Sequence, residues 1–166
     1  MKKPIKISQK VVDILIPRLS DEFKASYHYR NASNWCKDVG FFKAAKFFEA
    51  ESQSELEHAK GIENYLLDWN IVPVLPMIDA PATLESLADI IEKSYNLELA
   101  LYMDYEKDSK SLMDMGELQA FDFLAKYRQI QQESVAEYSD MMNTLEGCKT
   151  DDKFQLLMLE ENLFGE

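Results

Sequence analysis

Apolar residues recur at alternating spacings of three and four along most of the chain, which is the pattern of an α-helix with one buried face. Four long stripes of this kind are followed by a short one, and glycine or proline residues separate them. The first stripe contains Val12, Leu15, Leu19 and Tyr29. The pattern predicts helices over about residues 8–38, 41–70, 84–115, 117–146 and 151–164.

The connections between the predicted helices differ in length. Gly40 and Gly116 mark turns of a few residues, and helices joined by so short a turn pack as antiparallel neighbours. Residues 71–82 contain three prolines, which favour extended backbone. Twelve extended residues reach about 40 Å, close to the length of a helix of about 29 residues. This connection can therefore cross the bundle, which makes the third helix parallel to the second.

The helix pattern predicts one all-α domain over residues 1–166. It is a four-helix bundle with a long crossover between the second and third helices and a short fifth helix at the C-terminus. Ser8 and Thr83 are expected to cap the first and third helices, because serine and threonine are preferred at that position. Pro17 lies inside the first predicted helix and either kinks it or marks a later start.

Composition narrows the classes of function. The 166 residues are 46% hydrophobic and 29% charged, which indicates a globular core rather than disorder. The net charge of −12 opposes binding to phosphates, so neither nucleic acid nor an anionic membrane is an expected partner. An acidic surface suits a protein that handles cations, and it also serves solubility alone.

Cysteine usage and the N-terminus indicate a reducing compartment. Cys36 and Cys148 do not form a Cys-x-x-Cys pair, and two cysteines are too few for a disulfide framework. Residues 1–17 make a poor signal peptide, because their apolar run holds Asp13 and ends at Pro17. No stretch has the roughly 18 uncharged apolar residues of a membrane span. We therefore expect a cytoplasmic protein.

One large polar side chain interrupts the apolar stripe of each long helix: Glu22, Glu55, Glu98 and Gln131. Each lies near the middle of its helix, so in an aligned bundle the four side chains meet at one level. His58 follows Glu55 by three residues and shares its face of the helix. The five side chains are therefore expected to converge in the core.

Buried carboxylates at one level repel one another and are very unfavourable unless they are paired or bound to a cation. A pair of divalent cations balances this charge, and the oxygen and nitrogen donors suit iron or manganese. The predicted metal ligands are Glu22, Glu55, His58, Glu98 and Gln131. Two alternatives stay open: a lone glutamate in a stripe often reaches solvent, and Gln131 could be a hydrogen-bonded core amide.

Tyr29 lies seven residues after Glu22, two helical turns along the same face. It is close enough to hydrogen-bond a ligand or to donate an electron, so it joins the ligands as a predicted catalytic residue, with core filling as the alternative. His28 is expected to be structural. The other tyrosines of the third helix are expected to fill the core: Tyr95, Tyr102 and Tyr105.

These residues resemble the non-haem ferritins, and the resemblance covers nearly the whole chain. The matching features are Glu22 with Tyr29 and Trp35-Cys36, Glu55-x-x-His58 with Tyr65-Leu66, the proline-containing crossover, Tyr95-x-x-Glu98, Gln131 and the short C-terminal helix. The resemblance implies a ferritin-like bundle that is a ferroxidase, oxidising Fe²⁺ with dioxygen or hydrogen peroxide. It also implies a homo-oligomeric hollow shell of about 24 subunits that stores ferric mineral.

The same resemblance implies a role for each residue. One iron would be held by Glu22, Glu55 and His58, with Gln131 near it. Glu55 would bridge to a second iron held by Glu98 and a nearby carboxylate, which gives two iron ions per subunit. Tyr29 would be the tyrosine beside the ligands.

Differences from related proteins bear on haem and on further iron sites. Bacterioferritins carry a second Glu-x-x-His where this chain has Ser134, and a haem-ligand methionine where it has Leu56. No haem is therefore expected. A conventional third iron site is also not expected, because only one of its matching positions keeps a carboxylate: Ser54, Ile130, Glu133 and Ser134. The acidic pore of animal ferritins maps onto Phe121 and Leu124, which are not acidic.

Two other functions remain open. One is a non-storage di-metal oxidase or peroxide scavenger of low oligomeric state, and the other is a metal-free structural bundle. The apolar fifth helix favours the shell, because an isolated bundle has little use for it. Glu51 and Glu57 lie on the polar face of the second helix and could assist mineral nucleation, although a solvated face is the simpler interpretation.

Overall fold

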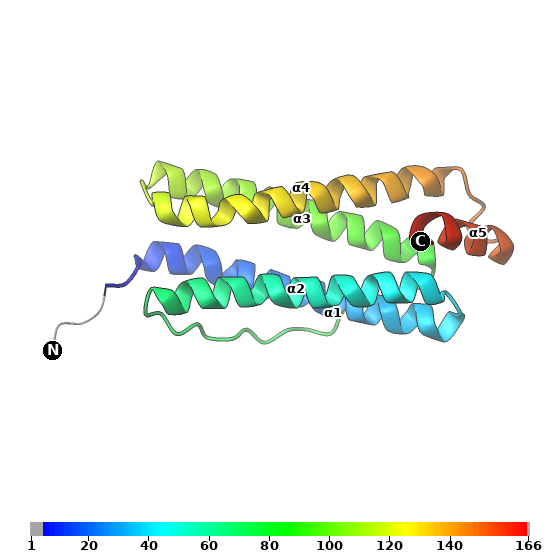
Figure 1. The fold of residues 1–166 in the computed structure, drawn as a ribbon, viewed down its shortest axis with the longest axis horizontal. Coiled ribbons are helices and arrows are strands. Elements are labelled where there is room, and N and C mark those ends of the chain that lie inside the picture. The colour runs from blue at the N-terminus through cyan, green and yellow to red at the C-terminus, as the bar shows by residue number, and fades with distance from the viewer. Residues whose placement is uncertain (1–4, 166) are drawn as a thin grey trace.

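Five α-helices make up the regular secondary structure of residues 5–165, the part of the chain that the computed structural model describes. They are α1 (Gln9–Val39), α2 (Phe42–Asp68), α3 (Leu87–Asp114), α4 (Leu118–Glu146) and α5 (Lys153–Phe164) (Figure 1). The described residues contain no strand, so the predicted all-α bundle with a short C-terminal helix is confirmed. None of the described helices is long and apolar enough to cross a lipid bilayer.

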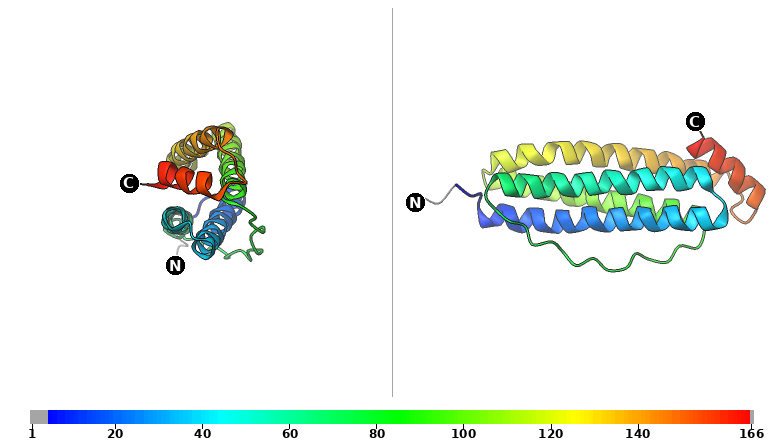
Figure 2. Two further views of the ribbon diagram at one scale, coloured as in Figure 1. Left: turned by 90° about the vertical axis from the view of Figure 1, so that its right-hand side faces the viewer. Right: turned by 60° about the horizontal axis from the view of Figure 1, so that its bottom comes forward.

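The four long helices form two antiparallel hairpins, α1 with α2 and α3 with α4, and the most extensive helix contacts lie within each hairpin. The crossover joins the hairpins along the outside of α1, as both views in Figure 2 show. It starts where Ile71 and Val74 share a surface pocket with Val12, and near its end the carbonyl of Ala82 accepts a hydrogen bond from Asn31 (3.2 Å). The third helix therefore runs parallel to the second, as predicted.

Helix ends follow the local cap signals, with one correction. Ser8 caps α1 by accepting from the Val11 amide, and α1 continues through Pro17 rather than starting after it. The prediction that Thr83 caps the third helix is wrong, because α3 starts three residues later than expected. Ser86 accepts from the Asp89 amide (3.0 Å), and the Asp89 carboxylate accepts from the Glu85 amide (2.9 Å). This two-way cap holds the chain extended up to Ser86.

The interior consists of two apolar clusters separated by a polar layer. One cluster lies toward α5 and includes Phe48, Ile91 and Leu145; the other lies toward the N-terminus of α1 and includes Leu15 and Leu66. Each fully buried large apolar side chain stabilises the fold by roughly 1.5–3 kcal/mol. The buried polar residues between the clusters are Glu22, Ser26, Ser52, Glu55, Ser94, Glu98 and Gln131. The two clusters thus position a layer that is itself unfavourable to bury.

Helix α5 docks on the α1–α2 turn by capping helix ends. The N-terminus of α2 has no side-chain cap of its own, and the Glu160 carboxylate accepts from the amides of Lys43 (2.7 Å) and Ala44 (3.0 Å). Lys153 donates to the Val39 carbonyl at the end of α1 (3.0 Å). Both contacts are favourable for the helix dipoles, because the acid lies at the N-terminus of α2 and the lysine at the C-terminus of α1. The fifth helix therefore has a use within a single chain, so its apolar character is weaker support for a shell than expected.

His28 links the two hairpins through a hydrogen bond to Ser94 (Nε2 to Oγ, 2.9 Å). It is 6% exposed. Burial lowers its pKa to about 4, and the charge of Lys93 acts in the same direction. His28 is therefore neutral in the folded chain, in keeping with the structural role expected for it.

The pH dependence of the free energy of unfolding should reveal the lowered pKa of His28. Its imidazole takes up a proton near pH 6.5 when the chain is unfolded and only near pH 4 when it is folded. Acidification through this window therefore favours unfolding, with a loss of roughly 3 kcal/mol. Because the other titrating groups are common to both proteins, urea unfolding should show the wild type losing roughly 3 kcal/mol relative to a His28→Gln variant across this window. Parallel stability curves for the two proteins would contradict this assignment.

Candidate metal centre

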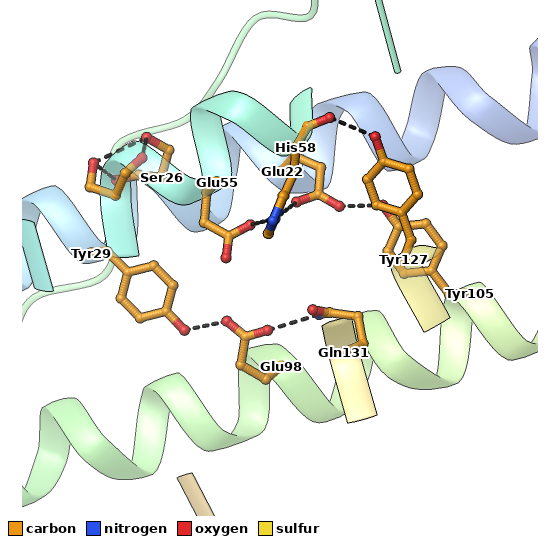
Figure 3. A network of polar contacts seen from close by, with 10 residues as sticks. Glu22, Ser26, Tyr29, Glu55, His58, Glu98, Tyr105, Tyr127 and Gln131 are labelled. Carbon is orange, nitrogen blue, oxygen red and sulfur yellow. Dashed lines mark hydrogen bonds and ion pairs between the residues drawn. The ribbon is translucent and has the colours of Figure 1, made fainter. Parts of the chain in front are cut away.

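Four of the five side chains predicted to converge belong to the polar layer, and the fifth, His58, lies against them. Glu22 comes from α1, Glu55 and His58 from α2, Glu98 from α3 and Gln131 from α4. The three glutamates and Gln131 are at most 2% exposed, and His58 is partly buried. Figure 3 shows that they divide into two groups: Glu22, Glu55 and His58 face Glu98 and Gln131 across the bundle.

The first group surrounds one point on the α1–α2 hairpin. Helical spacing places Nδ1 of His58 3.0 Å from Oε2 of Glu55, and the antiparallel packing of α1 brings Oε2 of Glu22 within 3.5 Å of the same nitrogen. One donor atom from each residue lies within 4.8 Å of the other two. These three residues alone offer a three-donor site to a cation.

The second group is centred on Glu98. Tyr29 donates a hydrogen bond to Oε1 of Glu98, and the amide nitrogen of Gln131 donates to Oε2 (2.8 Å). Both carboxylate oxygens thus have neutral donors, which stabilise a charged acceptor in a buried position. Gln131 is a hydrogen-bonded core amide in this arrangement, the alternative that its sequence position left open, and it lies at the level of the other predicted ligands.

Tyr105, which sequence reasoning treated as core filling, contacts the site directly. Its hydroxyl donates to Oε1 of Glu22, so a tyrosine of α3 serves a glutamate of α1. Tyr29 of α1 serves Glu98 of α3 in the same way. Each tyrosine lies seven residues after the glutamate of its own helix and bonds the glutamate of the other. This repeated spacing of seven residues is the feature of the sequence that could have predicted a contact between Tyr105 and the site.

Two smaller features fix the α2 residues in place. Ser26 and Ser52 donate to each other's backbone carbonyls (2.9 Å each), which holds α1 and α2 together one turn from Glu22 and Glu55. On the other side, Tyr127 donates to the His58 carbonyl (2.9 Å). A Cβ at Gly61 would lie 2.4 Å from that tyrosine hydroxyl, so glycine is needed for this close approach.

The pKa shifts of the site residues show that negative charge on the buried carboxylates is unfavourable unless a positive charge lies near them. Burial raises the pKa of Glu55, and the neighbouring carboxylate of Glu22 adds to the effect. Burial raises the pKa of Glu98 to about 7. Burial disfavours charge on His58 as well, but the Glu22 and Glu55 carboxylates outweigh it and raise the pKa of His58 to about 10. An imidazolium among carboxylates is therefore the stable state without a metal.

Glu51 is a second residue that the sequence did not place correctly. It lies four residues before Glu55, on the same face of α2, and it is partly buried rather than on a solvated surface. Burial and the charge of Glu137 raise the pKa of Glu51 to about 7, and the charge of Glu51 contributes to the raised pKa of Glu98. Glu57, by contrast, is exposed as expected.

The donor set fits a divalent metal ion that prefers oxygen and nitrogen. The clearest sign is Oε2 of Glu22, which is buried and has no hydrogen-bond partner. A buried carboxylate oxygen without a hydrogen-bond donor is unfavourable, and Nδ1 of His58, 3.5 Å away, compensates its charge only in part. A divalent ion held by Glu22, Glu55 and His58 would satisfy this oxygen and replace the proton of His58.

Comparisons with known proteins bear on the bundle as a whole. A model of the ferritin-like domain matches residues 12–148. A probable bacterial non-haem ferritin-like protein of Haemophilus influenzae is 28% identical over 158 residues, 95% of each chain. The bacterial non-haem ferritin of Campylobacter jejuni is 25% identical over 140 residues, 84% of each chain. The open pore ferritin of Archaeoglobus fulgidus has the same fold, with a TM-score of 0.89 over 97% of this chain and 99% of that one at 22% identity.

A divalent cation should stabilise the folded chain through these donors. Titration with Fe²⁺ under nitrogen, or with Zn²⁺ as an air-stable substitute, should raise Tm, since an ion at about 100 times its Kd adds about 2.7 kcal/mol. Glu22→Gln replaces a charged carboxylate by a neutral amide, a much weaker ligand, with little change in shape, and should lose most of the increase. Glu57→Gln, an exposed change on α2, is the matched control. Equal increases in the two variants would place the metal elsewhere.

Proposed function

The chain belongs to the ferritin family, and from this premise we propose that it stores iron by oxidising Fe²⁺ at the buried centre and holding the ferric product in an oligomeric shell. Iron storage is the function that the family supports. The ferroxidase reaction, the ligand set and the shell are specific to this proposal.

The observation that carries the proposal is the grouping of Glu22, Glu55 and His58 around the unpartnered Oε2 of Glu22. We assign these three residues as ligands of one ferrous ion. Within this group the Glu55 carboxylate points toward Glu98 across the bundle (Figure 3), so it is suited to share a second ion with Glu98. Glu51, one turn before Glu55, is the nearby carboxylate that we propose as the remaining acid of that second position.

The reaction follows from holding two ferrous ions, which are the substrate, side by side. Together they supply the two electrons that reduce dioxygen to peroxide, or hydrogen peroxide to water, so no one-electron product of the oxidant is released. The glutamates favour the ferric product because its charge is higher. Tyr29 and Gln131 orient Glu98 by their hydrogen bonds, and Tyr105 does the same for Glu22. No haem takes part in this scheme.

Two separate apolar surfaces support the assembly. Val72, Val74 and Met77 of the crossover are 81%, 81% and 93% exposed, and Phe154 of α5 is 71% exposed. Large apolar side chains that are this exposed in a single chain are typical of contacts with other subunits. Because the crossover and α5 lie on different parts of the chain (Figure 1), they fit two different interfaces, which closed shells require. We propose a cytoplasmic homo-oligomer of about 24 subunits.

Oxidation of Fe²⁺ should depend on the α2 ligands. The double variant Glu55→Ala, His58→Ala removes two donors of the first site and should lose the rapid absorbance increase of ferric product on mixing Fe²⁺ with air. A loss of about 3 kcal/mol of transition-state stabilisation corresponds to roughly a 100-fold slower rate. Glu57→Ala, which alters an exposed acid between the two ligands, should oxidise iron at the wild-type rate. An unchanged rate in the double variant would refute the assignment of the centre.

The molar mass of the protein in solution tests whether the subunits assemble into a shell. Light scattering after gel filtration should give about 24 subunits of 19.2 kDa each. Phe154→Asp places a charge on an exposed apolar position of α5 and should yield smaller species with unchanged helix content by circular dichroism. One or two subunits in the wild type would favour the rival function, a di-metal oxidase or peroxide scavenger of low oligomeric state.

A further inference from the structure

Aromatic rings lead away from the centre in two directions. Toward α5, Tyr29 stacks on Tyr138 (centroids 6.0 Å apart, planes 9° apart) and on Phe48 (6.1 Å, 10°). Tyr138 contacts Phe47, which contacts Phe164. Tyrosine is oxidisable by one electron at potentials that dioxygen chemistry reaches, whereas phenylalanine is not. This series therefore has its last oxidisable ring at Tyr138, which is fully buried.

The second series runs from the other tyrosine of the centre toward the C-terminal end of α2. Tyr105 stacks on Tyr127 (5.4 Å, 19°), Tyr127 contacts Phe123 (5.3 Å), Phe123 stacks on Tyr65 (3.9 Å, 15°) and Tyr65 contacts Trp69 (6.5 Å). Trp69 is partly exposed at the end of the helix. Unlike the first series, this one connects a tyrosine that is hydrogen-bonded to a proposed metal ligand with an oxidisable ring at the surface.

We propose that this series is a one-electron path between the metal centre and the protein surface. Tyr105 and Trp69, at its two ends, are the residues that become oxidised. The proposal rests on the proposed ferroxidase function. It applies when the oxidant at the centre has taken one electron from a single ferrous ion and needs a second. A ferrous ion in solution, meeting Trp69, is the donor of that second electron.

The electron balance is as follows. The oxidant at the centre takes one electron from Tyr105, and the phenolic proton moves along the existing hydrogen bond to Glu22. An electron then passes from Trp69 across the intervening rings to Tyr105, which recovers its proton from Glu22. The oxidised Trp69 takes one electron from Fe²⁺ outside the centre, which becomes Fe³⁺. The only bonds that change are the O–H bond of Tyr105, which breaks and re-forms, and the O–H bond made for the interval on Glu22, so the protein returns to its starting state.

The surroundings of each ring decide where an oxidised residue can persist. Tyr105 has a carboxylate to receive its proton, and tryptophan needs no proton acceptor to lose an electron. The Tyr127 hydroxyl faces only the His58 carbonyl, which is a poor base. The Lys126 ammonium lies 5.0 Å from the ring centres of both Phe123 and Tyr127 and disfavours positive charge there. The rings between Tyr105 and Trp69 therefore pass the electron on and do not hold the oxidised state.

Trp35 provides a comparison within the same chain. It is one of only two tryptophans in the sequence and is partly buried like Trp69. It stacks on Phe41 (6.3 Å, 17°), beside the turn between α1 and α2, at the opposite end of that hairpin from Trp69 (Figure 1). If bulk oxidants were responsible for damage, both tryptophans would be modified, whereas the proposed path directs oxidation to Trp69.

The test uses the full-length protein mixed in air with one Fe²⁺ per subunit. Electron paramagnetic resonance of rapidly frozen samples should show a tryptophan radical, and peptide mass spectrometry should find oxidation at Trp69 and not at Trp35. Trp69→Phe should lose the tryptophan signal and accumulate a tyrosine radical. Tyr105→Phe should lose the tryptophan radical and the oxidation at Trp69. Tyr138→Phe, the matched change in the other series, should leave both as in the wild type.

One further variant separates the path from an indirect effect of Tyr105→Phe on Glu22. Phe123→Leu contacts no proposed ligand, and it should also lose the oxidation at Trp69. Equal oxidation of the two tryptophans, or a tryptophan radical that survives Tyr105→Phe, would overturn the inference. Two ferrous ions per subunit give a separate readout. If the wild type does not oxidise them, the proposed function fails, and if it does so without any radical at one ion per subunit, only the path fails.

Discussion

The mutual repulsion of buried carboxylates is the constraint on which the rest of this structure depends. Three glutamates lie in the middle of an apolar bundle, where an uncompensated charge is very unfavourable. His58, Tyr29, Tyr105 and Gln131 supply the donors that make the layer tolerable without a metal. One oxygen of Glu22 still lacks a partner. That missing hydrogen-bond donor is the reason we propose a cation at this point.

The bundle serves this layer by holding four helices at fixed distances. Apolar clusters lie on both sides of it, and the Ser26–Ser52 pair keeps the α1–α2 hairpin tight beside it. The exchange of tyrosine hydrogen bonds between α1 and α3 connects the two hairpins at the level of the glutamates. Each half of the centre therefore depends on the other hairpin. The end capped by α5 is stabilised separately, through helix termini rather than through the core.

Local signals predicted most of the fold. The spacing of apolar residues identified all five helices, because that spacing reflects which face of each helix is buried and needs no knowledge of its neighbours. The three prolines of the crossover predicted its extended course. The start of α3 was predicted at the wrong residue because Thr83 and Ser86 are both good caps, and only Ser86 has an acid three residues later that returns a hydrogen bond.

The sequence by itself determined that three glutamates, a glutamine and a histidine would meet at one level, since each interrupts an apolar stripe near mid-helix. The tertiary structure decided how they divide: Glu22, Glu55 and His58 group around one point, while Glu98 pairs with Gln131 and Tyr29. It also decided that Tyr105 reaches Glu22 and that Glu51 is drawn inward. Periodicity places a residue on a face of its own helix. The oxygen that receives a given donor is set by distances between helices, and those depend on how every side chain in the interface packs.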